Sequence, residues 1–190
     1  MAKILGLDIS TSCTGWCVMD TECPLDVRNI ELGYILISKE KGSYRKAQKV
    51  LETLKEIQAK HQIEKIFIEE NLQTFRTGLS SAKTLATLAR FNGIVSYLCE
   101  EVFKRQPFFL NVNNARKSVG LQLIRKSKGG KPTKEQVMDW VCTQLTDDNI
   151  WPKKTLKSGP RKGIVILDPV CYDMADAYVI SRAGLMNICI

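Results

Sequence analysis

The sequence lacks the residue pairs and runs that mark several common classes of protein. His61 is the only histidine, and none of the seven cysteines forms a Cys-x-x-Cys pair, so we expect no structural zinc site. No apolar run approaches 18 residues, and no N-terminal signal segment is recognisable, so we expect neither membrane insertion nor secretion. An odd number of cysteines in such a chain favours reduced thiols. These absences predict a cytoplasmic protein.

One segment also lacks acidic residues. The net charge is +8, yet residues 1–103 carry 13 basic and 13 acidic side chains, and residues 135–190 carry 6 and 7. The excess therefore lies in residues 104–134, where a merely solvated surface would mix the two signs. This pattern predicts an anion-binding surface, nucleic acid being the first candidate, although a basic face that serves only solubility is an open alternative. The nine basic residues are Lys104, Arg105, Arg116, Lys117, Arg125, Lys126, Lys128, Lys131 and Lys134.

The apolar periodicity predicts one α/β domain over residues 1–190, with a five-stranded mixed sheet flanked by helices. The first three strands should form an antiparallel meander, and the fourth should be covered on both faces. Residues 146–163, which are rich in Pro, Gly and basic residues, are predicted to be a long loop. The expected strands are 3–7, 15–19, 31–38, 65–69 and 108–110, and the expected helices are 43–61, 79–103, 112–119, 133–145 and 173–186.

Four carboxylates lie at the ends of these elements. Asp8 follows the first strand, Glu69 ends the buried strand, and Asp173 and Asp176 lie on one face at the start of the final helix. Side chains at such positions can converge at the ligand crevice of an open sheet. Four hard oxygen donors without histidine or thiolate select Mg²⁺ or Mn²⁺. Glu70 competes with Glu69, which we prefer because three apolar residues lead directly into it.

This acidic set predicts a metal-dependent phosphodiesterase. In the two-metal scheme, ions about 4 Å apart stabilise the attacking water and the leaving oxygen. Asp8 would touch both ions, with Glu69 on one side and the Asp173/Asp176 pair on the other. Each acid also has a purely structural interpretation: Asp173 as a helix-capping acid, Asp8 as a turn residue and Glu69 as an exposed strand end.

The motifs resemble those of the RuvC-type Holliday junction resolvases, in the ribonuclease H-like superfamily. Residues 4–16 resemble the opening motif of that family, 67–69 the second motif, and 172–177 the terminal Asp-x-x-Asp-Ala motif. Residues 112–120 resemble the basic helix before the DNA-contacting loop. The resemblance implies a ribonuclease H-like fold, a homodimer that makes paired symmetric nicks in four-way DNA junctions, two metal ions per site, and no small-molecule substrate. It also implies that Asp8, Glu69, Asp173 and Asp176 are the metal ligands.

The chain departs from the bacterial pattern in two places. The basic segment 146–168 is longer, and Leu72, followed by Phe75, stands near the place of an aromatic residue after the second acid. The compact size would suit a phage or viral member acting in the DNA compartment of a bacterial or infected cell. The expected DNA-binding residues are Arg76, Arg116, Lys117, Arg125, Lys126, Lys128, Lys131, Lys134, Lys153 and Lys154.

Three other functions remain open at this point. The opening motif also resembles the phosphate loop of actin-like ATPases and sugar kinases, but no second phosphate loop follows. A catalytically idle nucleic-acid-binding module would gain nothing from clustered acids. A nuclease of the same kind could instead act on forks, flaps or RNA–DNA hybrids.

The predicted helix 79–103 offers a dimer seam. Its apolar residues at helical spacing would pack against a second copy, although the helix could equally be ordinary core cover. The residues of this seam are Leu85, Leu88, Ala89 and Val95.

Overall fold

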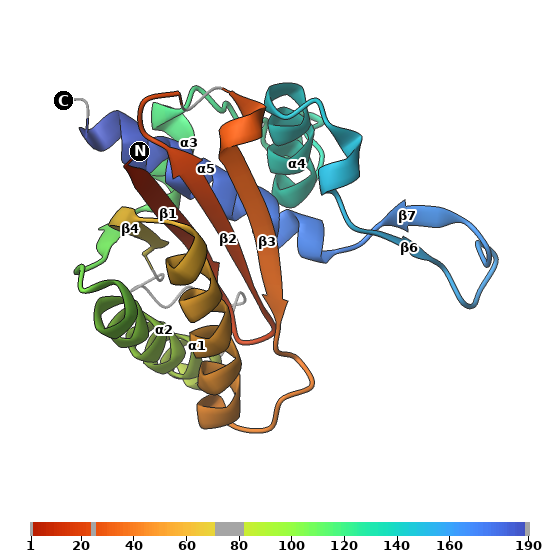
Figure 1. The fold of residues 1–190 in the computed structure, drawn as a ribbon. Helices are drawn as coiled ribbons and strands as arrows, with labels where there is room; N and C mark the ends of the chain where they lie inside the picture. Colours follow the sequence, from red (N-terminus) through yellow and green to blue (C-terminus); the bar gives the residue numbers. More distant parts are fainter. Residues whose placement is uncertain (1, 24–25, 71–81, 189–190) are drawn as a thin grey trace.

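A mixed five-stranded sheet forms the centre of the molecule (Figure 1). The computed structural model describes residues 2–23, 26–70 and 82–188. The strand order is β3-β2-β1-β4-β5; β1 to β3 are antiparallel neighbours, whereas β4 runs parallel to both β1 and β5. The predicted sheet, its meander and its buried fourth strand are therefore confirmed. The strands are β1 Lys3–Ile9, β2 Cys13–Asp20, β3 Ile30–Leu36, β4 Ile63–Glu69 and β5 Phe108–Leu110.

Helices cover both faces of this sheet, and each face has its own apolar core. Helices α1 (Ser43–Lys60) and α2 (Ala82–Phe103) pack on one face, against the side of β1 that carries Leu5 and Leu7. Helix α5 (Val170–Ile188) crosses the other face, together with α3 (Val112–Ser118) and α4 (Thr133–Gln144) (Figure 1). Successive residues of a strand point to opposite faces, so the unbroken apolar run of β1 supplies both cores. Among the described residues, no helix is both long and apolar enough to cross a membrane.

The prediction that Val95 contributes to a dimer interface is wrong. Val95 is fully buried within the chain's own core, between α2 and the sheet, because it faces α1 and β4 rather than solvent. Leu85 and Leu88 are half-buried and Ala89 is exposed, so these three remain available for contact.

Helix α5 lies unusually close to the sheet because two strand residues are glycines. A Cβ atom added at Gly15 would lie 1.9 Å from the carbonyl oxygen of Asp173, and one added at Gly6 would lie 2.2 Å from Ser181 Oγ. The Ser181 hydroxyl donates a buried hydrogen bond of 3.0 Å to the carbonyl oxygen of Cys17. These contacts hold α5 directly over the sheet, with its start at Gly15 of β2 and its middle, at Ser181, over Gly6 of β1.

The segment predicted to be a loop, 146–163, is mostly turn and irregular structure, but it also supplies one strand of a projecting β-ribbon. Strands β6 (Lys153–Thr155) and β7 (Val165–Leu167) pair as a separate antiparallel sheet that extends away from the body (Figure 1). The prediction missed this pairing because the strands are only three residues long and Pro and Gly dominate the turn between them. The final helix also begins at Val170, three residues before the predicted start, because the Asp168 carboxylate accepts a hydrogen bond from the Val170 amide at 3.2 Å.

Candidate active site

The four acids singled out from the sequence meet at one end of the sheet. Asp8 lies near the end of β1, and Glu69 is the last residue of β4. The two strands are parallel neighbours, and the residues just before these acids, Leu7 and Ile68, pair with each other. Helix α5 brings Asp173 and Asp176 over the same strand ends. The carboxylates of Glu69, Asp176 and Asp173 all act electrostatically on Asp8. The structure therefore brings the other three carboxylates within electrostatic range of Asp8.

Burial and mutual repulsion make this group costly to ionise. Burial raises the pKa of Asp8 well above its usual value, and Glu69, Asp176 and Asp173 raise it further. Burial and the charge of Asp176 raise the pKa of Glu69 to about 7. Burial also raises the pKa of Asp173, against the opposing effects of Lys134 and of a hydrogen bond from the Cys13 thiol. A site of this kind is stabilised by added positive charge.

One buried arginine supplies part of that charge. Arg116 Nη2 donates to Asp176 Oδ1 at 2.9 Å, and the two side chains are 14% and 10% exposed. The Arg116 Nε atom is buried and has no hydrogen-bond partner among the described residues. Arg116 was predicted as a DNA-binding surface residue, whereas the structure places its guanidinium inside the acidic site. The sequence interval of 60 residues between Arg116 and Asp176 gives no sign of this pair.

Lys134 is the second cation of the site. It lies in the first turn of α4 and lowers the pKa of Asp8, Glu69 and Asp173 through its charge. Its side chain is exposed, so it stands at the mouth of the acidic cluster and not within it. An exposed lysine beside buried carboxylates can contact an anion that enters the site.

The donor set fits a hard divalent cation. Carboxylate oxygens are the ligands that Mg²⁺ and Mn²⁺ prefer, and burial and mutual repulsion raise the pKa values of Asp8 and Glu69, so a bound cation would favour their ionised form. As the side chains stand, no three His, Cys, Asp or Glu residues in the described part of the chain are grouped closely enough to hold an ion. Asp176 is engaged by Arg116 in this arrangement. Because the arginine engages Oδ1, ion binding through that oxygen would require Asp176 to turn from the guanidinium.

Several positioning residues escaped the sequence analysis. Asn92 on α2 is buried, and its Nδ2 donates to the carbonyl oxygen of Glu69 at 3.4 Å, which fixes the end of β4. Ser10 Oγ donates to the carbonyl oxygen of Cys13 at 2.6 Å and shapes the turn after Asp8. An asparagine on the apolar face of a helix was the available signal for Asn92, because a buried amide needs partners.

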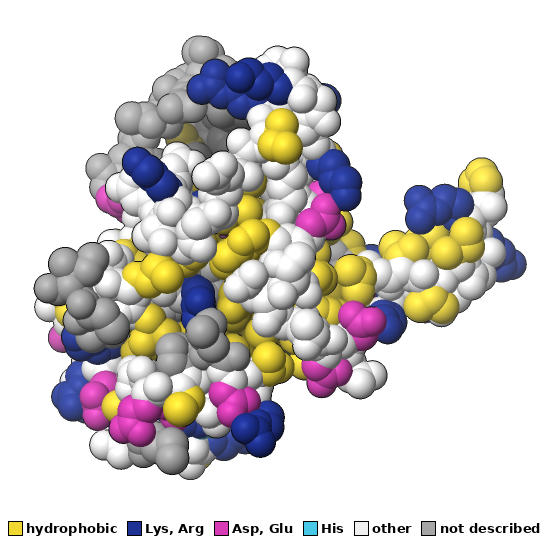
Figure 2. Space-filling model, turned by 90° about the horizontal axis from the view of Figure 1, so that it is seen from above, with side chains coloured by type: hydrophobic (Ala, Val, Ile, Leu, Met, Phe, Trp, Pro, Cys, Tyr) yellow, Lys and Arg dark blue, Asp and Glu magenta, His cyan; other side chains and the backbone are white. Residues whose placement is uncertain are grey.

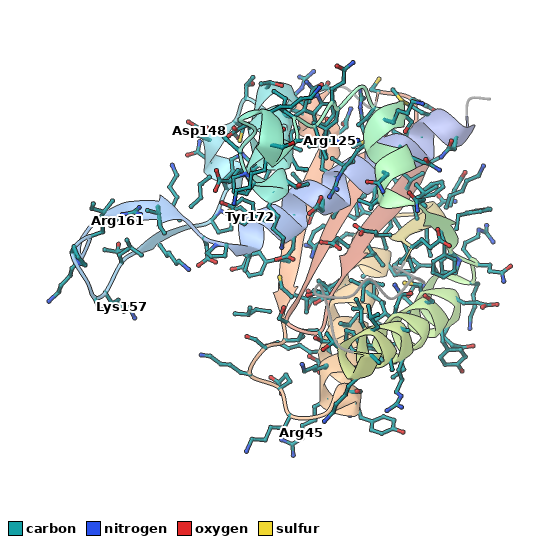
Figure 3. The ribbon with its side chains drawn as sticks, turned by 180° about the vertical axis from the view of Figure 1, so that it is seen from behind. Arg45, Arg125, Asp148, Lys157, Arg161 and Tyr172 are labelled. Carbon is teal, nitrogen blue, oxygen red and sulfur yellow. The ribbon has the colours of Figure 1, made fainter. Side chains whose placement is uncertain are left out.

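The expected DNA-binding residues occupy different settings. Lys117 on α3 and the cations of the following loop are exposed, with Arg125 near α4 in Figure 3. Lys131 is exposed and pairs with Asp139 at 2.6 Å, and Lys154 lies 3.8 Å from Asp168 at the base of the ribbon. Arg76, with Leu72 and Phe75, lies outside the described residues. The remaining exposed cations of the predicted set are Lys126, Lys128 and Lys153.

Comparison with solved structures identifies the fold. No protein-family model matches the chain, and no curated protein sequence matches it. RuvC from Thermus thermophilus, solved in complex with a Holliday junction substrate, superposes with a TM-score of 0.62 at 14% identity, over 100% of this chain and 96% of that one. A second structure of Thermus thermophilus RuvC gives 0.59 at 16% identity, over 98% and 95%. The yeast mitochondrial Holliday junction resolvase Ydc2 gives 0.52 at 12% identity, over 96% and 77%. The chain thus has the ribonuclease H-like fold of RuvC, as predicted.

Proposed function

We propose that this chain is a divalent-cation-dependent DNA endonuclease that resolves four-way junctions. The observation that carries the proposal is the convergence of four carboxylates from β1, β4 and α5 at one end of a RuvC-like sheet. Clustered buried acids weaken a fold, and proteins retain such strain at functional sites. The solved structure of RuvC with a Holliday junction supplies the class of substrate.

The residues divide the work by their positions. Asp8 lies among the other three acids and would contact two ions, with Glu69 holding one and the Asp173/Asp176 pair the other. Two bound Mg²⁺ or Mn²⁺ ions would supply the activation of water and the stabilisation of the leaving oxygen. Lys134, at the mouth of the cluster, would hold a non-bridging oxygen of the phosphate that is cut. Gly15 keeps Asp173 within reach of β1 by letting α5 approach.

The two-fold symmetry of a four-way junction favours a homodimer that presents two equivalent sites and makes paired symmetric nicks. Helix α2 would supply the interface through Leu85, Leu88 and Ala89, none of which is fully buried. The exposed cations after α3 would hold phosphates and position the DNA without reading its sequence. Such an enzyme would act in the cytoplasm of a bacterial or infected cell, and no small-molecule substrate is needed.

The test is a cleavage panel in Mg²⁺ and in Mn²⁺ with a four-way junction, a fork, a flap, an RNA–DNA hybrid and plain duplex. We expect the junction to be cut fastest, with symmetric nicks. Asp8→Asn and Asp176→Asn should abolish cleavage and leave junction binding intact, whereas Asp148→Asn, at an exposed acid (Figure 3), should cut like the wild type. Faster cutting of a fork, flap or hybrid would replace the substrate. Absence of cutting on every substrate, or a wild-type rate in Asp8→Asn, would overturn the proposal.

A further inference from the structure

The β6–β7 ribbon carries only positive charge along its length. Residues 149–167 contain five basic side chains and no acid. The ribbon extends from the body as a separate arm (Figure 2), and Lys157 and Arg161 lie on its outer part (Figure 3). Lys157, Arg161 and Lys162 are all exposed, whereas Lys154 is close to Asp168 at the base. The outer half of the arm is therefore a cationic surface held away from the core.

One face of the ribbon also carries two apolar side chains that are open to solvent. Thr155 pairs with Val165 and Lys153 with Leu167, and residues two apart in a strand share a face, so these four side chains lie together. Val165 and Leu167 are 58% and 41% exposed. Both side chains are therefore open to solvent over a large part of their surface. A cationic arm with an open apolar face fits a partner that offers both phosphates and apolar surface.

The base of the ribbon is fixed to the acidic site. The Asp168 amide donates to the carbonyl oxygen of Pro152 at 2.8 Å, and the Cys171 thiol donates to the same oxygen at 3.3 Å. A groove of about 420 Å³ runs from Asp173 to Lys154, past the exposed side chain of Tyr34. The direction of the arm is thus set by the same helix start that carries Asp173.

We propose that the β6–β7 ribbon is a DNA-binding arm that enters a groove of the duplex leaving the acidic site. The inference rests on the proposed function, because it assumes DNA at the four carboxylates. The major groove of B-DNA admits a two-stranded β-ribbon and exposes thymine methyl groups to it. Lys157, Arg161 and Lys162 hold the phosphates that border the groove, and Val165 and Leu167 face its apolar walls.

A second copy of this chain fits the ribbon less well than DNA does. Stable protein interfaces bury at least about 1,200 Å² in total. The paired strands of the ribbon are three residues long and offer two apolar side chains on the open face, which is too little for such an area. Two ribbons would also repel each other, since neither carries an acid between residues 149 and 167.

The test compares two triple variants that lose equal charge. The ribbon variant carries Lys157→Ala, Arg161→Ala and Lys162→Ala. The control carries Lys41→Ala, Arg45→Ala and Lys55→Ala, at exposed positions on and before α1; Arg45 is labelled in Figure 3. Binding to four-way junctions is measured in EDTA over a range of salt, with long arms and with arms cut back toward the branch. We expect the ribbon variant to bind long-armed junctions at least tenfold more weakly and to lose up to about 2.7 from the slope of log affinity against log salt, at about 0.9 per phosphate contact. Shortening the arms should weaken the wild type and the control but not the ribbon variant.

A second variant separates charge from shape. Val165→Thr with Leu167→Thr keeps strand-forming residues, so binding should weaken with the salt slope unchanged. Wild-type affinity and slope in the ribbon triple variant would overturn the inference. So would a loss of dimer on sedimentation with unchanged DNA binding per protomer, because the arm would then contact a second copy. Failure of the wild type to cut any junction would refute the proposed nuclease function. The binding measurements are made without metal, so they would still test separately whether the ribbon binds DNA.

Discussion

Replacing Arg116 tests how the acidic site is held together without metal. The Arg116–Asp176 pair is nearly buried, and removing one partner of a buried ion pair costs about 3–5 kcal/mol because the other charge is left uncompensated. Arg116→Gln would leave Asp176 beside three further carboxylates. Of the two cations that lower the pKa values of these acids, only Lys134 would remain. Since both side chains retain some exposure, we expect a loss near the lower end, about 3 kcal/mol, in the free energy of unfolding. Urea unfolding in EDTA at pH 7.5 or so would measure it, with Lys117→Gln, an exposed neighbour, as the control.

A double-mutant cycle identifies the origin of that loss. Asp176→Asn removes the charge that Arg116 compensates, so the double variant should be more stable than Arg116→Gln alone. Mn²⁺ should also raise the unfolding midpoint more in Arg116→Gln than in the wild type, because Asp176 is then free to bind the ion. A stability within about 0.5 kcal/mol of the wild type would place the effect in the range of ordinary surface substitutions and refute this account. An unchanged or smaller Mn²⁺ effect would show that the arginine does not compete with the metal.

Three further perturbations follow from the same geometry. Gly15→Ala should force α5 away from β2, because its Cβ would meet the Asp173 carbonyl oxygen. We expect the free energy of unfolding to fall by about 1–3 kcal/mol and cleavage to be lost. The control Gly93→Ala, whose Cβ meets open space, should leave both unchanged. Wild-type cleavage by Gly15→Ala would show that the close approach is not required. Metal-free protein should lose stability as pH rises from about 4.5 through about 7. The pKa of Glu69 is higher in the folded than in the unfolded protein, so protonation of Glu69 favours the folded state, and this stabilisation is lost as Glu69 ionises. Urea midpoints in EDTA at acidic and alkaline pH would show this decline, and Glu69→Gln should reduce it. Asp8→Asn should likewise be more stable than the wild type at alkaline pH, because it removes a repelled carboxylate; a wild-type midpoint that rises with pH would contradict both expectations.

The sequence was sufficient to predict the positions of the acids but not the charges that surround them. Asp8 and Glu69 follow apolar runs that could only be strands, and the i, i+3 spacing of Asp173 and Asp176 places them on one helical face, so their meeting followed from the order of elements. The position of Arg116 depends on how α3 packs against α5, a contact between segments about 60 residues apart that no local pattern encodes.

The ribbon shows a different limit of local patterns. Three-residue strands are too short to show alternation, so the Pro and Gly residues between them dominated the prediction of a loop. The structure pairs them because the main chain continues the ladder beyond the strands: the Leu156 amide donates to the carbonyl oxygen of Ile164 at 3.0 Å, and the Gly163 amide to that of Leu156 at 2.9 Å. Backbone hydrogen bonds of this kind need no particular side chains, and for that reason they leave little trace in a single sequence.

The repulsion among the four acids gives a physical reason for the close contacts between α5 and the sheet. Four carboxylates repel one another, and helix α5 carries two of them, so electrostatic repulsion pushes the helix off the sheet whenever the acids are ionised. Gly6, Gly15 and the buried bond from Ser181 to Cys17 oppose that push with packing and hydrogen bonding that do not depend on pH or metal. Arg116 pairs with Asp176, and its charge together with that of Lys134 lowers the pKa of Glu69, yet burial and mutual repulsion still hold the pKa values of Asp8 and Glu69 above their usual range. The backbone of the site is thus built to stay closed without a cation, while its side chains retain a charge deficit that a divalent cation would fill.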